Sequence, residues 1–312
     1  MSDTPTNAAS IELTAVLVAV TADEPRVLTI QDGNALPSGP FETDHRTLQA
    51  GLRAWVERQT HHPLGYVEQL YTFADRDRTE DGGGRVISIS YVGLAREARA
   101  SGDDEPGWRS WYNYLPWEDW RSGAPAIIGK MILPALKRWA TEAADALTRR
   151  ERGHRMAINF AASDRDWNEE LVLQRYELLY EAGLVPEAAR QRLVANPVPG
   201  RPMRHDHRRI LATGVARLRA KIKYRPVVFE LMPPAFTLLQ LQRTVEALSG
   251  VRLHKQNFRR LVEHQGLVEE TGGISGETGG RPARLVRFRR EVLLERPAPG
   301  LRLRAGRRVT VS

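Results

Sequence analysis

The sequence contains no cysteine, which excludes disulfide bonds and cysteine-ligated zinc sites. It also lacks any apolar run close to the ~20 residues that a membrane-spanning helix requires. The apolar run at 11–20 is short and follows a polar, uncharged-to-acidic start, which is not the pattern of a signal peptide. From these absences we expect a cytoplasmic protein, and its 312 residues favour two domains.

Several motifs of catalysis and cofactor binding are missing as well. There is no phosphate-binding P-loop, no GxGxxG fingerprint and no Ser/His/Asp arrangement, so we predict no catalytic residue and no cofactor. The histidine-bearing stretches, His61-His62 and His205-Asp206-His207, lack the i, i+4 spacing of a helical metal pair. We interpret them as surface histidines or helix caps and predict no metal site.

The charge is unevenly distributed along the chain. Residues 201–312 hold 24 Lys and Arg against 9 Asp and Glu, whereas residues 1–200 hold 22 against 29. A basic segment of this size is typical of a surface that binds a polyanion. The sequence therefore places nucleic-acid binding in the last third and leaves another role for the rest.

The stretch 236–267 has the pattern of two short helices joined by a tight turn. Thr237 and Gln240 form a capping box at the start of the first helix. Gly250 ends that helix, because glycine tolerates the left-handed conformation of a C-terminal cap. The second helix ends near residue 266, and three residues at helical spacing form its apolar side: Phe258, Leu261 and Val262.

The opposite side of the second helix is polar and basic. At 100° per residue, Gln256 and Arg260 point directly away from Phe258. Three further residues lie on the flanks: Lys255, Asn257 and Arg259. A helix with an apolar back and this front suits the DNA major groove, where such side chains meet phosphates and base edges.

A glycine-rich stretch at 272–280 predicts a turn, and residues 281–290 predict a strand after it. Val286 and Phe288 alternate with arginines, as in a half-buried strand. Two helices followed by a two-stranded ribbon make a winged helix, with Arg281 and Arg284 at the wing. We predict DNA binding here; the alternative is a solvated basic helix and hairpin on an ordinary domain.

The front part of the chain predicts strands around one helix. The ranges 11–20, 26–30, 65–73 and 85–95 have strand patterns, and 47–59 has a helical apolar face. Strands flanking a helix indicate an α+β or mixed α/β domain.

These residues resemble the Nudix box, G-x5-E-x7-R-E-U-x-E-E-x-G-U, whose glutamates hold Mg²⁺ against a pyrophosphate. Gly39, Arg53 and Glu57 match the pattern. Three positions that hold glutamate in the pattern hold other residues here: His45, Ala54 and Arg58. Thr60 replaces the second glycine. Hard divalent cations need carboxylate oxygens, so the resemblance implies a domain without catalytic metal.

The remaining charged residues of this helix suggest ligand binding instead. The guanidinium of Arg58 would repel Mg²⁺ and attract the phosphates of a nucleotide. We predict a ligand site formed by Arg53, Glu57 and Arg58, of which only one arginine reaches the ligand, because the two lie five residues apart. The alternative is a decayed box in which Arg53 pairs with Glu57 at i, i+4.

The two parts in this order resemble the Nudix-related transcriptional regulators of NAD metabolism, the NrtR family. The resemblance covers roughly 11–98 and 204–290 and is carried best by KYRPVVFELMPPAFTL at 223–238, NFRR at 257–260 and GRPARLVRF at 280–288. It implies a Nudix-like domain that senses ADP-ribose or a related nucleotide, a winged helix that binds a double-stranded DNA operator, and a homodimer paired through the front domain.

Residues at about 100–203 fall outside the resemblance and form a helical insert. The segment 108–120 carries four of the seven tryptophans, which predict a packed core or a subunit contact, or else a platform that stacks an adenine. We predict helices at 126–150, broken or kinked at Pro134, and at 168–182. A third helix at 206–222 leads into the DNA-binding module.

The sequence thus predicts an α+β protein with a Nudix-like mixed sheet, a helical insert and a C-terminal winged helix. We expect a sensor domain at 11–222, a DNA-binding domain at 223–295 and a basic tail at 296–312. The expected function is a repressor of NAD metabolism genes with an inactive Nudix-like domain. The alternatives are an active ADP-ribose pyrophosphatase with a basic nucleic-acid-binding tail, and an adaptor whose insert binds another protein.

Overall fold

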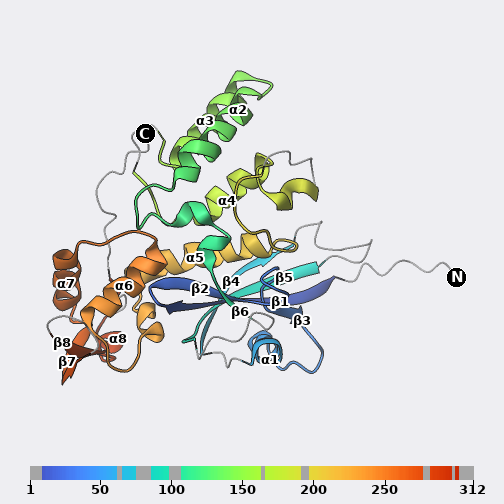
Figure 1. Ribbon diagram of the computed structural model, residues 1–312. Helices are drawn as coiled ribbons and strands as arrows, with labels where there is room; N and C mark the ends of the chain where they lie inside the picture. Colours follow the sequence, from blue (N-terminus) through green and yellow to red (C-terminus); the bar gives the residue numbers. More distant parts are fainter. Residues whose placement is uncertain are drawn as a thin grey trace.

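The computed structural model describes residues 9–61, 65–74, 86–97, 107–162, 166–190, 197–276, 282–296 and 299–301. Within these ranges a six-stranded mixed sheet forms the front of the chain, a group of helices stands above it, and a winged helix lies at one end (Figure 1). Every helix in these ranges is too short or too polar to span a lipid bilayer.

The sheet has the strand order β4-β5-β1-β2-β6, and β3 pairs with β1. Its strands are β1 Ser10–Thr21, β2 Glu24–Thr29, β3 Ser38–Pro40, β4 Tyr66–Phe73, β5 Val86–Leu94 and β6 Gly107–Ser110. β1 runs parallel to β5, and the other pairs are antiparallel. β6 lies in the stretch expected to be insert, so the sheet takes its edge strand from it.

One helix covers each face of the sheet. Helix α1 (Leu48–Thr60) packs on one face and α5 (His207–Tyr224) on the other (Figure 1). Because both faces are covered, β1 is apolar on both sides. Leu17 belongs to the apolar cluster under α1, and Val16 belongs to the apolar cluster under α5. Gly214 lets α5 approach closely, since a Cβ there would lie 2.9 Å from Val16 Cγ1.

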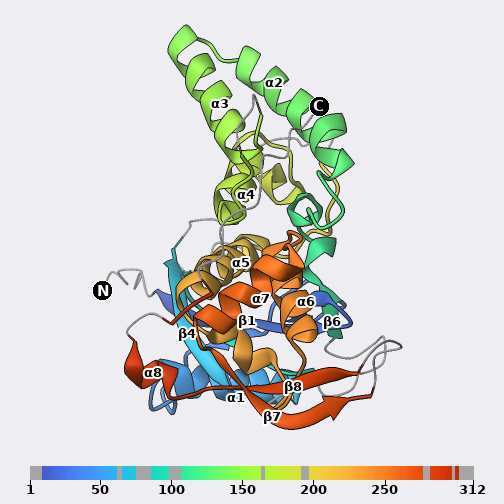
Figure 2. The same cartoon turned by 90° about the vertical axis from the view of Figure 1, so that its left-hand side faces the viewer.

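The insert between β6 and α5 is helical, as expected. It contains short helices η2 Trp111–Asn113 and η3 Pro116–Glu118, a π-helical turn η4 Ile128–Ile132, and then α2 Leu133–Thr141, α3 Ala146–Asn159, α4 Val172–Glu181 and η5 Pro186–Arg190. Helices α2 and α3 form a hairpin that projects from the rest of the molecule (Figures 1 and 2).

The predicted position of the break between these two helices, at Pro134, was wrong. Pro134 lies in the first turn of α2, directly after the π-helical turn, and the chain stays helical to Thr141. Proline is tolerated there because the wider turn before it does not need its missing N–H. The break comes later, where the Asp145 carboxylate accepts the Thr148 amide at 2.8 Å and begins α3.

The winged helix has the predicted order of elements. It comprises η6 Val227–Leu231, α6 Leu238–Ser249, α7 Lys255–His264, β7 Val268–Ser275, β8 Ala283–Phe288 and α8 Val292–Glu295. Phe236 pairs with Val286 through two backbone hydrogen bonds and adds a third chain segment to the ribbon. The predicted turn at 272–280 is shifted, because β7 continues to Ser275 across an irregularity between Glu270 and Ile274.

Candidate functional site

Helix α7 presents the polar face that its sequence predicts. Phe258 and Val262 are buried, whereas Leu261 is only half-buried, against expectation. Five polar residues are exposed on the other sides of the helix: Lys255, Gln256, Asn257, Arg259 and Arg260. Figure 2 looks onto α7 with the two strands of the wing below it. The exposed amide and guanidinium groups can donate hydrogen bonds to an anion or to base edges.

Both hydrogen bonds of the capping box at the start of α6 are present. Gln240 Oε1 accepts the Thr237 amide at 2.7 Å, and Thr237 Oγ1 accepts the Gln240 amide at 3.2 Å. At the other end, Gly250 has a φ of +74° and caps the helix. Both ends of α6 are therefore defined by the residues that the sequence identified.

A buried carboxylate that the sequence reading missed sets the start of α7. Glu246 on α6 is 3% exposed. Its Oε1 accepts the Leu253 amide at 2.9 Å, and its Oε2 accepts Arg252 Nη1 at 2.8 Å. Gln242 Nε2 donates both to Glu246 Oε1 and to the Leu253 carbonyl. The i, i+4 spacing of Gln242 and Glu246 was the available signal, and the pair fixes the turn between the two helices.

The wing carries cross-strand ion pairs. Arg284 Nη1 lies 2.6 Å from Glu270 Oε1, and Arg287 Nε lies 2.7 Å from Glu269 Oε1. Both pairs are exposed, so they contribute little stability and rearrange easily. A groove of about 690 Å³ runs between the wing and the two helices, with Lys255 and Arg259 in its lining. Arg281, the other predicted wing residue, lies outside the described residues.

The predicted ligand residues on α1 are all exposed. Arg53 Nη2 donates to the Gly65 carbonyl at 3.1 Å. The Arg58 guanidinium lies 4.6 Å from the centre of the Trp55 ring. The structure therefore directs the two arginines to different partners, in agreement with their spacing, and leaves the Glu57 carboxylate in solvent contact.

Two residues of the Nudix-box pattern have a clear packing role. Gly39 lies directly under Trp55, where a Cβ would approach Cδ2 to 2.2 Å, and Trp55 Nε1 donates to the Pro40 carbonyl at 2.8 Å. His45 stands where the pattern has a glutamate, and its Nδ1 accepts the Glu42 amide at 3.0 Å. Within the described ranges, no three His, Asp or Glu side chains converge to hold a metal ion.

Two of the other histidines have roles in local structure. His207 is buried in the first turn of α5, and its Nδ1 accepts the Leu36 amide at 2.9 Å, so it is neither the surface histidine nor the helix cap that we expected. The sequence did not predict burial of the His207 ring, because its partner Leu36 is 171 residues away along the chain. His61 ends α1 with a left-handed conformation. His62 lies outside the described residues.

The four tryptophans at 108–120 are buried in the protein, Trp108 in the cluster under α1 and the other three in the cluster that contains α5. Trp111 and Trp117 are fully buried, Trp108 is 6% exposed and Trp120 is 5% exposed. Trp120 stacks on Trp167 with ring centres 4.1 Å apart. None of these four rings is free to stack a nucleotide base at the surface, which rules out the adenine platform and agrees with the packed core.

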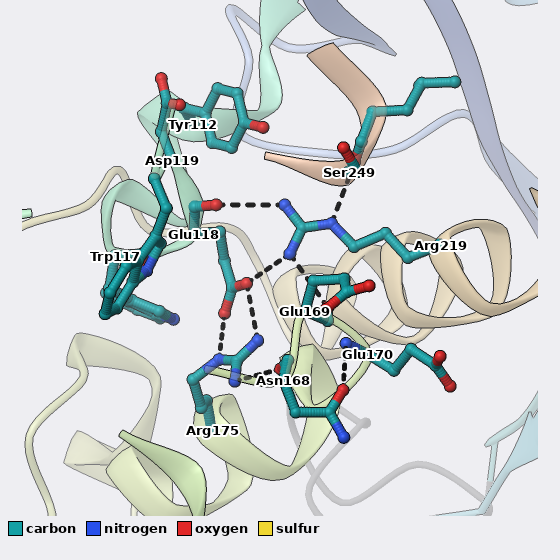
Figure 3. Close-up of polar contacts among 12 residues, drawn as sticks. Tyr112, Trp117, Glu118, Asp119, Asn168, Glu169, Glu170, Arg175, Arg219 and Ser249 are labelled. Carbon is teal, nitrogen blue, oxygen red and sulfur yellow. Dashed lines mark hydrogen bonds and ion pairs between the residues drawn. The ribbon is translucent and has the colours of Figure 1, made fainter. Parts of the chain in front are cut away.

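A buried polar cluster at the end of α6 was also missed by the sequence reading (Figure 3). Glu118 on η3 lies between Arg175 on α4 and Arg219 on α5, and all three are buried. Tyr112 OH donates to the Ala247 carbonyl at 2.8 Å. Burial raises the pKa of Tyr112 to about 12, so this hydroxyl stays protonated and remains a donor at neutral pH.

Comparison with known proteins identifies the C-terminal domain. Residues 228–288 match the family described as the NrtR DNA-binding winged helix domain. Over 83 residues the chain is 45% identical to the ADPR responsive transcriptional repressor NtrR of Acinetobacter baylyi. That match covers 27% of this chain and 33% of the other, so the chain spans about a third of the length of this curated relative.

Two solved structures resemble nearly the whole chain. A MutT/nudix family protein from Enterococcus faecalis is 15% identical, with a TM-score of 0.49, and the match covers 93% of this chain and 90% of that one. Shewanella oneidensis NrtR complexed with a 27mer DNA is 21% identical, with a TM-score of 0.51, covering 90% and 94%. With the mixed sheet and the order α6, α7, β7, β8, the chain is an α+β protein that resembles the fold of Shewanella oneidensis NrtR, and its residues 228–288 form a winged helix that matches the NrtR DNA-binding winged helix domain.

Proposed function

We propose that this protein is a transcriptional repressor that binds double-stranded operator DNA and responds to ADP-ribose or a related nucleotide. The observation that carries the proposal is the exposed Lys, Gln, Asn and Arg face of α7, held on a winged helix in the basic third of the chain. The curated relative, itself an ADPR responsive transcriptional repressor, supports the same role here. The family resemblance extends the proposal to genes of NAD metabolism.

In this proposal α7 lies in the major groove of the operator. Gln256 and Arg260 face base edges, because they point directly away from the buried Phe258. Three residues flank them: Lys255, Asn257 and Arg259. Of these, Lys255 and Arg259 contact phosphates. The wing residues Arg281 and Arg284 also contact phosphates, which position the protein without reading sequence.

The Nudix-like domain binds the nucleotide in this proposal without cleaving it. Arg58, placed over the half-buried Trp55, offers a guanidinium to the diphosphate, and Arg53 and Glu57 complete the charged surface of α1. The residues at the Nudix-box positions do not suit Mg²⁺: His45, Ala54 and Arg58 stand where the pattern has carboxylates, and hydrolysis of a pyrophosphate relies on a bound cation.

We also propose that the protein acts as a homodimer. One winged helix reads only a short half-site, and two copies related by a two-fold axis read a palindrome. Sedimentation of the protein at micromolar concentration, alone and with operator DNA, tests this. Monomer under both conditions would contradict it.

The central experiment measures binding to the promoter region beside the protein's own gene by fluorescence anisotropy, with and without ADP-ribose. We expect specific binding whose affinity changes at least about fivefold with ADP-ribose, the lower end of ordinary allosteric coupling. ADP-ribose alone should raise the melting temperature. AMP release from ADP-ribose with added Mg²⁺, at ordinary enzymatic turnover, would overturn the non-hydrolytic role and favour the pyrophosphatase.

A further inference from the structure

The buried cluster around Glu118 joins three parts of the chain that are distant in sequence. Glu118 Oε1 lies 2.5 Å from Arg175 Nε, and Oε2 lies 2.6 Å from Arg219 Nη1 (Figure 3). The three side chains come from the insert (η3 and α4) and from α5, and none has more than 2% exposure. A carboxylate that receives two guanidinium groups out of water has one favourable geometry, because each fork fixes the direction of its hydrogen bonds.

Arg219 extends this cluster to the DNA-binding domain. Its Nε donates to the Leu248 carbonyl at 2.9 Å, and its Nη2 donates to the Glu118 carbonyl at 3.2 Å. Leu248 belongs to the last turn of α6, where backbone carbonyls have no partner within the helix. The guanidinium therefore holds the end of α6 and the insert in one network.

The insert holds the same end of α6 through two more hydrogen bonds. Tyr112 OH donates to the Ala247 carbonyl at 2.8 Å, and the Trp120 amide donates to the Gly250 carbonyl at 2.7 Å. The next residues form the turn that Glu246 fixes at the start of α7. The position of the exposed face of α7 is therefore set by the insert and α5 together.

Helix α5 also holds the face of the sheet opposite α1. Gly214 brings its backbone against Val16 on β1. One turn before the helix ends, Lys221 Nζ contacts Tyr66 OH at 2.6 Å and pairs with Glu68, both on β4. A shift of the sheet against α5 would reach Arg219, which lies between these contacts along the same helix.

We propose that the insert is the element that couples the two domains through α5, with Glu118 on the insert and Arg219 on α5 as the positioning residues. Glu118 fixes the Arg219 guanidinium, and Arg219 fixes the end of α6, so a ligand-dependent shift of the sheet changes the presentation of α7 to DNA. The inference rests on the proposed function, because it requires that nucleotide binding and operator binding influence each other.

Two matched variants separate coupling from simple stability. Arg219→Lys keeps the charge but removes the fork that reaches Leu248. Arg175→Lys makes the same change at the same burial and against the same Glu118, but the other hydrogen bonds of Arg175 go to the Asn159 and Asn168 carbonyls and its guanidinium stacks on Trp167, all within the insert. We measure operator Kd with and without ADP-ribose, the melting temperature, and amide hydrogen exchange, all in the full chain.

We expect Arg219→Lys to bring the ratio of the two Kd values to within about twofold of unity, against at least about fivefold in the parent. ADP-ribose should still raise its melting temperature. The amides at the end of α6 and in α7 should exchange faster in Arg219→Lys than in Arg175→Lys, which should keep the parent's ratio. Should Arg219→Lys not fold, Tyr112→Phe removes one donor to the same turn with little change in volume and should lower the ratio.

The outcomes distinguish the two proposals. A parent protein whose operator affinity ignores ADP-ribose would contradict the proposed function, and the exchange comparison would then test the positioning role alone. Equal exchange in the two lysine variants, or an unchanged Kd ratio in Arg219→Lys, would overturn the assignment of the insert as the coupling element. An equal decrease of the Kd ratio in both variants would overturn it as well, because the cluster would then only stabilise the fold.

Discussion

Arg219 Nη1 lies 2.6 Å from Glu118 Oε2, and its Nη2 also donates to the backbone carbonyl of Glu118, so one guanidinium holds both the side chain and the main chain of this glutamate. The two residues are 101 positions apart in the sequence. This double contact joins the insert to α5 at the point where α6 ends, and several consequences can be measured.

Removal of the Glu118 carboxylate should strongly destabilise the protein. Burial lowers the pKa of Arg175, an effect that the Glu118 charge opposes. In Glu118→Ala two buried guanidinium groups lose their counter-charge, which costs about 3–5 kcal/mol. Urea unfolding followed by circular dichroism measures the loss. Glu118→Gln, which retains an oxygen acceptor, should lose less, and a loss below about 1 kcal/mol in Glu118→Ala would show that the charge is not needed.

Replacement of Arg260 should affect recognition of particular bases. Arg260→Ala should weaken operator binding by about 1–3 kcal/mol and relax specificity at one base position, because a bidentate contact to a base edge is lost. Anisotropy titrations against the operator and against single-base variants measure this. Operator binding equal to that of the parent would show that another helix lies in the groove.

Replacement of Arg284 should affect all DNA sequences alike. Arg284→Ala should reduce the slope of log K against log salt by about one, since one phosphate contact releases one counterion. The structure pairs Arg284 with Glu270 across the wing. Glu270→Gln should therefore have the opposite effect and strengthen binding to unrelated DNA, since it frees the guanidinium. If Glu270→Gln leaves this binding unchanged, the wing does not contact phosphate through Arg284.

Gly250 should not tolerate a side chain. Its φ is +74°, and a Cβ would lie 2.4 Å from the Glu118 carbonyl, so Gly250→Ala should cost more than the ~1 kcal/mol of the left-handed conformation alone. Gly153 in α3 is a matched control, because a Cβ there meets nothing within 4 Å. Gly153→Ala should stabilise by about 0.5–1 kcal/mol, since alanine favours a helix. Thermal unfolding of both variants compares them, and equal effects would contradict the close contact.

Asp119 should make part of the stability depend on pH. Burial alone would raise its pKa, but hydrogen bonds from the side chain and amide of Arg121 outweigh burial, and the pKa is lowered. A carboxyl with a lower pKa in the folded state stabilises the protein above its unfolded pKa of about 3.9 and loses that contribution as the pH falls below it. The difference in unfolding free energy between the parent and Asp119→Asn should shrink between pH 7 and pH 3, and a constant difference would contradict this.

The sequence predicted what depends on neighbours along the chain. The period of apolar residues located the two helices of the winged helix, and the capping box and Gly250 located both ends of α6. The same reasoning placed the strands that form the centre of the sheet. These features are local, because residues three or four apart on a helix, or two apart on a strand, decide them.

Features that join distant segments were not predictable in this way. The burial of His207 depends on Leu36, and the charge of Glu118 is stabilised by arginines 57 and 101 positions away. In the sequence, Glu118 stands beside Asp119 among tryptophans, and the arginine three residues on, Arg121, pairs with Glu24 and Asp119. The roles proposed for Arg53, Glu57 and Arg58, which are exposed on α1, remain predictions.

A single apolar core runs from β1 through the tryptophans of the insert to α5, α6 and α7, with Val16, Trp117, Leu218, Leu248 and Phe258 all among its buried members. Such a core has no plane along which the DNA-binding domain could be separated from the Nudix-like domain without exposing apolar surface to water. Heating should therefore unfold both domains in one transition. A graft of residues 228–288 alone onto another domain would leave the α6 side of that core uncovered, so a working transfer of the winged helix requires the insert and α5 to move with it.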